Sequence, residues 1–82
     1  MPEICNFYGI VIAMFYNEYE KPHFHARYAE YSAQIFIDDL SIKNGKLPKR
    51  AYKLVKEWAQ QHKDELLDMY MTKNFVKLPP LE

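Results

Sequence analysis

The chain of 82 residues carries 11 Lys and Arg against 11 Asp and Glu, so its formal net charge at pH 7 is zero. This length predicts one domain over residues 1–82, and the charge balance argues against a general nucleic-acid coat protein, which is basic overall. A single cysteine excludes an intrachain disulfide scaffold. Because no apolar run approaches the roughly 20 residues of a membrane span and no signal-peptide pattern is present, we expect a cytoplasmic protein without a membrane segment.

The first half of the chain predicts antiparallel strands. Residues Phe7–Tyr16, FYGIVIAMFY, are almost entirely apolar and rich in β-branched and aromatic side chains, which predicts one central strand. His23–Tyr28 and Tyr31–Asp38 follow as two shorter strands joined by a tight hairpin at Ala29-Glu30. Asn44-Gly45 is a turn signal after a further short extended piece. The sheet is therefore expected to have three or four strands.

One long amphipathic helix and an extended tail are expected after the sheet. Pro48 fits the first helical turn, and apolar residues then recur at helical spacing to about Tyr70. Pro79-Pro80 exclude a helix near the end of the chain, which predicts an extended tail. The fold class is thus α+β, with the helix packed on one face of a small antiparallel sheet. The other face is left uncovered, which favours a partner protein or a second copy of the chain.

The stretch KPHFHARY, residues 21–28, contains two of the three histidines, two positions apart. In an extended segment, residues i and i+2 point to the same side, so His23, His25 and Arg27 are expected to form one row. Such a row can bind a metal, perform acid–base chemistry, hold an anion or simply solvate one side of a sheet.

A metal site needs a third ligand, and His62 is the remaining histidine of the chain. It falls on the apolar stripe of the expected helix, so it meets His23 and His25 if their row faces that helix. Zinc or another divalent ion then has three nitrogen ligands; no other cofactor is expected. The alternative is that His62 is a core residue that hydrogen-bonds a backbone carbonyl or a tyrosine hydroxyl.

The same row also suits metal-independent RNA cleavage. Histidine titrates near neutral pH, so His23 or His25 can act as general acid or base, while Arg27 can stabilise a phosphate in the transition state. The competing interpretation is that these polar side chains only solvate the exposed side of the sheet. No glycine-rich phosphate loop, cysteine pair or nucleophile elbow supports a nucleotide-dependent or hydrolase function.

Basic residues concentrate where the helix is expected to begin. Six of the 11 lie between Lys43 and Lys56, and no acid lies between Asp39 and Glu57. A helix dipole prefers the opposite order, so local stability does not explain the pattern. A positive helix start does attract RNA, another phosphate-bearing ligand or an acidic partner, whereas a solvated lysine face is the alternative. The candidate binding residues are Lys46, Lys49, Arg50, Lys53 and Lys56.

The segments FYGIVIAMFY, KPHFHARY, GKLPKRA, VKEWA and PPLE are distinctive as a set. Together they resemble the short bacterial proteins grouped as domain of unknown function 4160, nearly from end to end of the chain. Ala29 stands where that family usually has a glycine, which puts the type of this turn in question. His23 and His25 are the family's signature and are carried over as the site. Arg27, Arg50 and Trp58 follow, although Trp58 also lies on the apolar helix face that is typical of a core.

The resemblance implies a partner rather than an activity. Members look like halves of two-gene modules of the toxin–antitoxin type, which implies a cognate small protein partner. Our first interpretation is a component of such a module acting through a partner-protein interface, with the basic helix start and the histidine strand forming one surface. The alternatives are a small RNA-cleaving toxin that uses His23 and His25 with Arg27 or Arg50, and a histidine metal-binding module.

Overall fold

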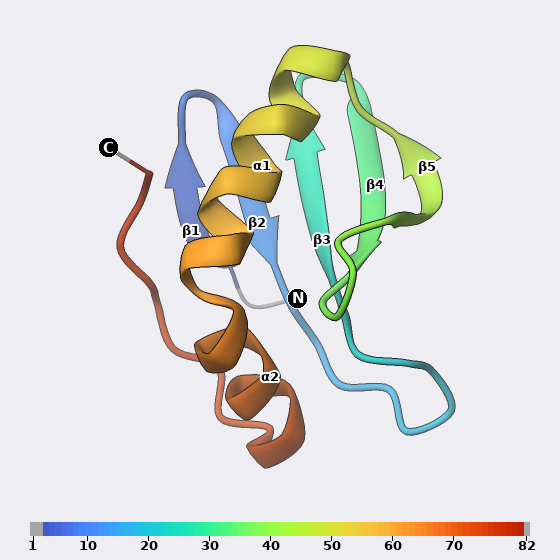
Figure 1. Cartoon of the computed structure of the whole chain (residues 1–82), viewed down its shortest axis with the longest axis vertical. Coiled ribbons are helices and arrows are strands. Elements are labelled where there is room, and N and C mark those ends of the chain that lie inside the picture. The colour runs from blue at the N-terminus through green and yellow to red at the C-terminus, as the bar shows by residue number, and fades with distance from the viewer. Residues whose placement is uncertain (1–2, 82) are drawn as a thin grey trace.

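The computed structural model describes residues 3–81 and shows five antiparallel strands followed by two helices (Figure 1). In chain order the elements are β1 Glu3–Phe7, β2 Ile10–Ala13, β3 His23–Tyr28, β4 Tyr31–Phe36, β5 Ile42–Lys46, α1 Lys49–Gln61 and α2 Lys63–Thr72. The strands form one sheet in chain order, each paired with the next. The predicted α+β class is confirmed, whereas the predictions of three or four strands and of one long helix are wrong.

The predicted strand Phe7–Tyr16 is wrong because the chain reverses within it. Tyr8 and Gly9 have φ angles of 51° and 78°, and two successive left-handed residues form the two-residue loop of a tight hairpin. Phe7 pairs with Ile10 across this loop. Within the run FYGIVIAMFY the residues on both sides of the loop are apolar, so the pattern of polar and apolar residues does not reveal the turn.

The hairpin predicted at Ala29-Glu30 is confirmed, but the turn predicted at Asn44-Gly45 is wrong. These two residues lie inside β5, which pairs with β4 through an irregular register. Gly45 has a φ of 82°, and a Cβ at this position would overlap the backbone carbonyl oxygen of Ser32. Glycine is required here so that two strands can approach each other, rather than for a reversal of the chain.

The predicted continuous helix is interrupted at His62. This residue has φ −118° and ψ 18°, and its amide donates a hydrogen bond to the Ala59 carbonyl oxygen (3.2 Å). The apolar stripe continues across the break, which is why periodicity alone predicts one helix. The break lets α2 reach the β2–β3 connection, where the Tyr70 hydroxyl donates a hydrogen bond to the Asn17 carbonyl oxygen (2.8 Å).

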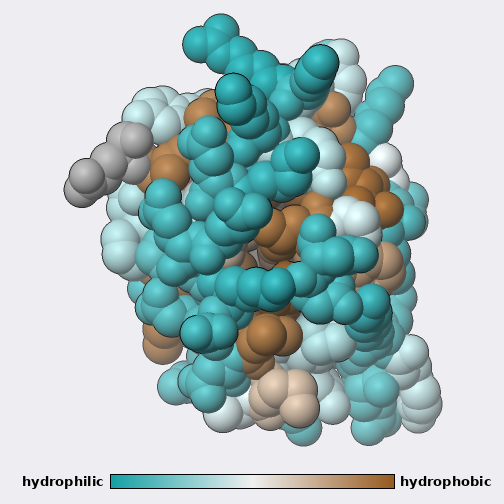
Figure 2. Space-filling model, viewed as in Figure 1, coloured by the Kyte–Doolittle hydropathy of each residue, from teal (hydrophilic) through white to brown (hydrophobic). Residues whose placement is uncertain are grey.

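The core lies between the sheet and the helices: α1 crosses one face of the sheet, and α2 lies beyond the end of the strands (Figure 1). Trp58 is fully buried at its centre, with its ring 5.8 Å from that of Phe7 and 6.3 Å from that of Phe24. Figure 2 shows hydrophilic side chains over most of the helix-bearing side, with apolar side chains visible between them. We call the opposite side of the sheet, which neither helix covers, the outer face.

The tail after α2 has no helix or strand and runs beside β1. The Leu78 amide donates a hydrogen bond to the Ile4 carbonyl oxygen (2.8 Å). The indole Nε1 of Trp58 donates one to the Pro79 carbonyl oxygen (2.9 Å). The tail therefore occupies the edge of β1 and closes the core at that end.

Candidate functional site

Strand β3 directs His23, His25 and Arg27 to the outer face and Phe24 and Ala26 into the core. The alternation of a strand requires this separation, and both Phe24 and Ala26 are fully buried. The three members of the row differ in exposure: His23 is buried, His25 is half-buried and Arg27 is exposed. The sequence placed the row on one face, but alternation alone does not show how deeply each side chain lies.

His23 is only 1 % exposed, and its ring is fixed on several sides. Its Nδ1 lies 2.9 Å from the Lys21 carbonyl oxygen, which makes Nδ1 the donor. The rings of Phe15 and Tyr70 lie 6.0 Å and 6.2 Å away. Its Nε2 has no hydrogen-bond partner among residues 3–81 and lies 3.6 Å from a carboxylate oxygen of Glu20. A side chain enclosed in this way does not contact a substrate that arrives from solvent.

A charged network lies next to His23 and ties the β2–β3 connection to the sheet. Lys43 Nζ donates to Glu20 Oε1 at 2.6 Å and to Gln34 Oε1 at 3.0 Å. Asn17 Nδ2 donates to Glu20 Oε2 at 3.2 Å. The hydrogen bond from Lys43 lowers the pKa of Glu20, so this carboxylate stays charged.

His25 is half-buried, and its Nε2 is buried and has no hydrogen-bond partner among residues 3–81. Its ring lies 5.0 Å from that of Phe15 and 5.5 Å from that of His23. Burial lowers the pKa of His25 from its usual 6.5, and the nearby His23 and Lys43 lower it further. At neutral pH the imidazole is therefore uncharged, which is the form that accepts a proton or a metal ion.

A hollow of about 490 Å³ opens beside His25 on the outer face. Its floor consists of small and half-buried side chains of β2 and β3, and Arg27 stands at its side. No ion pair to Arg27 forms within residues 3–81. The residues that line this outer hollow are Glu3, Val11, Ala13, His25, Ala26, Arg27 and Ser32.

The structure does not bring His62 to the other two histidines. Its ring packs 5.2 Å from that of Trp58, on the core side of the sheet, and its Nδ1 lies 2.7 Å from Glu65 Oε1. His23 and His25 lie on the outer face. In the part of the chain that the structure describes, no group of three or more His, Cys, Asp or Glu is placed to hold a metal ion. The three-histidine grouping expected from the sequence is therefore not formed.

The predicted binding residues divide between the two sides of the sheet. Lys46 shares the outer face with Arg27, because cross-strand pairing continues that row from β3 through β4 to β5. The other four lie on the opposite side of the sheet, in α1. The single surface expected from the histidine strand and the basic helix start is therefore wrong. The residues on α1 are Lys49, Arg50, Lys53 and Lys56.

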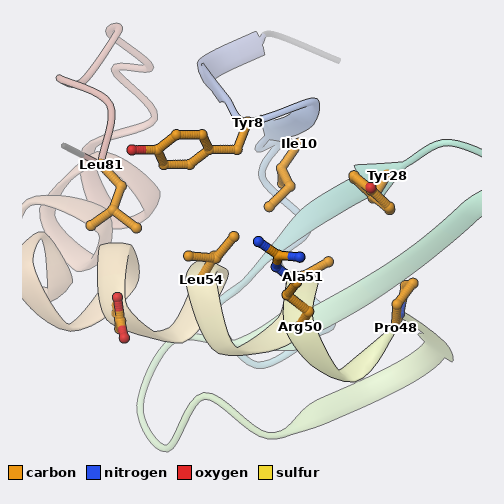
Figure 3. Close-up of a pocket in the computed structure, with 9 residues that line it drawn as sticks. Tyr8, Ile10, Tyr28, Pro48, Arg50, Ala51, Leu54 and Leu81 are labelled. Atoms are coloured by element: carbon orange, nitrogen blue, oxygen red, sulfur yellow. The ribbon is translucent and has the colours of Figure 1, made fainter.

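A groove of about 620 Å³ runs between α1, the β1–β2 turn and the tail (Figure 3). Figure 3 shows the Arg50 side chain pointing from α1 into the space between Tyr8 and Tyr28. Sequence reasoning identified Arg50 but missed both tyrosines, because the turn that carries Tyr8 was not predicted. The residues that line this Arg50 groove are Tyr8, Ile10, Tyr28, Pro48, Arg50, Ala51, Leu54, Glu57 and Leu81.

One of the comparisons with known proteins identifies a family. A family model described as Domain of unknown function (DUF4160) matches residues 9–71, which include the histidine row, Arg50 and Trp58. No curated protein and no solved structure matches the chain. Within residues 3–81, neither helix is long and apolar enough to cross a membrane.

Proposed function

Because this chain belongs to the DUF4160 family, whose description assigns no activity, we propose that it works by binding a partner protein, as one component of a toxin–antitoxin-like two-gene module. The observation that supports this function is the open outer face of the sheet. Helix α1 lies across the other face (Figure 1). A sheet whose side chains are apolar on both faces is usually covered on both faces. An uncovered face with half-buried apolar residues therefore indicates that a second protein covers it.

The side chains of the outer face suit such an interface. Val11 and Ala13 are half-buried around the outer hollow, and Phe15 lies half-buried beside them. The exposed Arg27 stands next to this apolar area. Protein interfaces commonly combine an apolar centre with arginine and aromatic anchors. The outer hollow is then the position at which a partner side chain inserts.

The charge of this face indicates what the partner presents. Arg27 and Lys46 continue one cross-strand row and neither forms an ion pair within residues 3–81. Glu3 is the acid that lines the outer hollow. A partner segment with acidic side chains complements this row, and the attraction between the charges raises the association rate constant.

The test is co-expression of this chain with the product of the gene beside its own, followed by measurement of the affinity of the complex. Arg27→Glu reverses the charge at the outer hollow and is expected to weaken the complex by about tenfold or more. Lys77→Glu makes the same charge change at an exposed residue of the tail and serves as control. A folded Arg27→Glu variant that binds as tightly as wild type contradicts the proposal.

RNA cleavage is a second candidate function, and the lowered pKa of His25 is the observation that favours it. A neutral imidazole acts as a general base, and Arg27 beside it supplies the cation that stabilises a phosphate. His23 is enclosed, so in this function it positions His25 through the contact of their rings and does not touch the RNA.

Cleavage is tested with a defined single-stranded RNA and the purified chain. His25→Gln is expected to lower the rate by about 10²–10⁴, the usual contribution of a general base. His25→Gln keeps the charge at Arg27, but His25 also lines the outer hollow, so the affinity for the partner is measured on the same variant beside the rate of cleavage. If wild type leaves the RNA intact and still binds its partner, the nuclease candidate is excluded and the interaction function stands.

A further inference from the structure

We propose that the Arg50 groove is a nucleotide site, in which a base stacks on the exposed ring of Tyr8 and the phosphate is bound by the Arg50 guanidinium, with the Tyr28 ring on the other side of that guanidinium. The ligand is a free nucleotide or a nucleotide of single-stranded RNA, since both present the same planar base and phosphate. The groove is on the helix-bearing side of the molecule, so this site does not depend on the proposed functions of the outer face.

The dimensions and lining of the groove suit a ligand of this size. Its volume of about 620 Å³ falls in the range of roughly 300–1,000 Å³ that is usual for small-molecule sites. Ile10 and Ala51 are buried beneath it, and Leu54 is half-buried. The apolar floor accepts the face of a base or the ribose, while the polar groups stand at the rim.

Both tyrosine side chains are open to solvent. Tyr8 is 59 % exposed and Tyr28 is 36 % exposed. Tyr8 also has a left-handed backbone, with φ 51°, at a turn position that normally carries Asn, Asp or Gly. The turn would be better formed by one of those residues, and the Tyr8 ring makes an edge-on contact with the ring of Phe7 at 6.2 Å while much of it stays open to solvent. Exposed aromatic rings beside cations are the usual platform on which unpaired bases stack.

The second ring, that of Tyr28, packs against Gly9. Gly9 has a φ of 78°, and a Cβ added at this position would lie 3.5 Å from Cε1 of Tyr28. The Tyr28 ring therefore rests against the backbone of the turn that carries Tyr8. The hairpin that sequence reasoning missed thus carries one ring and contacts the other, and Figure 3 shows the two rings on opposite sides of Arg50.

Arg50 supplies the charge that a phosphate needs. Its guanidinium points into the groove between the two tyrosines (Figure 3), and it forms no ion pair within residues 3–81. The first turn of α1 contains no acid, and Lys49 and Lys53 stand exposed nearby. An arginine fork matches two phosphate oxygens at once. Glu57 lines the groove two turns along the helix and can accept hydrogen bonds from amino groups of a base.

The experiment measures fluorescence anisotropy of a labelled, 2′-O-methylated hexanucleotide titrated with the whole chain. The 2′-O-methyl groups prevent cleavage that needs the 2′-hydroxyl, so the result does not depend on nuclease activity. Tyr8→Asn removes the ring and keeps a residue that favours the left-handed turn. Arg50→Gln removes the charge. Each variant is expected to bind about tenfold more weakly, the usual effect of losing a stacked ring or a charged phosphate contact.

Two matched variants control for loss of any tyrosine or any positive charge. Tyr19→Asn removes a ring that is 88 % exposed in the β2–β3 connection, and Lys77→Gln removes a charge from the tail. Both are expected to bind like wild type. The buried Trp58 reports through its fluorescence that every variant is folded.

Competition with free adenosine and uridine monophosphates separates the two sources of the ligand. Displacement by either shows that the groove takes a single nucleotide, and binding without displacement shows that it needs a strand; both support the site. The proposal is overturned if wild type binds neither probe, or if the control variants weaken binding as much as the groove variants. It is equally overturned if the groove variants change only the affinity for the partner protein, because the groove is then a protein-docking surface.

Discussion

The indole Nε1 of Trp58 donates a hydrogen bond to the carbonyl oxygen of Pro79 at 2.9 Å, which joins the centre of the core to the tail. Trp58→Phe keeps an aromatic ring but leaves that carbonyl with only the weak donor Cys5 Sγ, at 3.6 Å. We expect the free energy of unfolding to fall by about 2–3 kcal/mol, the sum of a lost hydrogen bond and a smaller core side chain. Urea denaturation measures this change.

A shortened chain that ends at residue 76 provides the control for Trp58→Phe. It lacks the Pro79 carbonyl, so Trp58→Phe there is expected to cost about 1 kcal/mol less than in the full chain. Equal costs in both chains would show that the hydrogen bond to the tail contributes nothing and that only ring packing matters.

A comparison of Gly45 with Gly9 separates two destabilising effects of a Cβ: a clash between neighbouring strands and the strain of a left-handed backbone. Both have positive φ, but a Cβ at Gly45 overlaps the backbone of Ser32, whereas a Cβ at Gly9 has only the Tyr28 ring within ordinary contact. Gly9→Ala is expected to cost about 1 kcal/mol and Gly45→Ala about 3 kcal/mol, both measured by thermal or urea unfolding. A Gly45→Ala variant as stable as Gly9→Ala would show that β4 and β5 separate without penalty.

Tyr70 connects α2 to the connection that carries Glu20. Its hydroxyl donates to the Asn17 carbonyl oxygen at 2.8 Å and accepts from the Asn17 amide at 3.2 Å. Tyr70→Phe is expected to lower stability by about 1–2 kcal/mol. It is also expected to speed hydrogen exchange at the Asn17 amide.

The neighbouring Tyr16→Phe is the matched control for Tyr70→Phe. Its ring lies 5.2 Å from that of Tyr70 and is half-exposed, so its hydroxyl faces solvent more freely. It is expected to leave exchange at Asn17 unchanged. Equal acceleration in both variants would assign the effect to ring packing rather than to the Tyr70 hydroxyl.

The sequence predicted those parts of the fold in which polar and apolar residues alternate clearly. The strands around Ala29-Glu30 and the apolar stripe of α1 follow from spacing alone, and Trp58 lies in the core as its position on that stripe indicates. The reversal at Tyr8-Gly9 was missed because residues on both of its sides are buried in the same core. Local pattern contains no information on which part of an apolar run turns back.

The candidate site was predicted in its residue types but not in its depth or grouping. Strand alternation placed His23 and His25 on one face, but only the packing of the β2–β3 connection encloses His23. His62 follows the helical stripe as expected, yet the stripe faces the core and not the histidine row. The side of a sheet on which a helix packs depends on tertiary structure. The metal alternative needed the helix to pack on the side of His23 and His25, and residue spacing does not determine that side.

The lowered pKa of His25 predicts how stability changes with pH. Burial is the main cause of the shift, with His23 and Lys43 adding to it and Glu20 opposing it. The unfolded chain then binds this proton at a higher pH than the folded chain does. The stabilisation is fully present above the usual pKa of 6.5 and is lost as the pH falls below that value.

Urea unfolding of wild type at pH 7.5 and at pH 5.5 is therefore expected to show lower stability at pH 5.5, and His25→Gln is expected to show a smaller loss. Glu20 is the internal control, because its lowered pKa acts only below its usual value of 4.5, where stability falls as the carboxylate is protonated. Glu20→Gln should therefore show the wild-type difference between pH 7.5 and 5.5 or a larger one, because Glu20 opposes the lowering of the His25 pKa. If His25→Gln loses as much stability as wild type across this interval, the half-buried imidazole is protonated as readily in the folded chain as in the unfolded one, and it is not the neutral base that RNA cleavage requires.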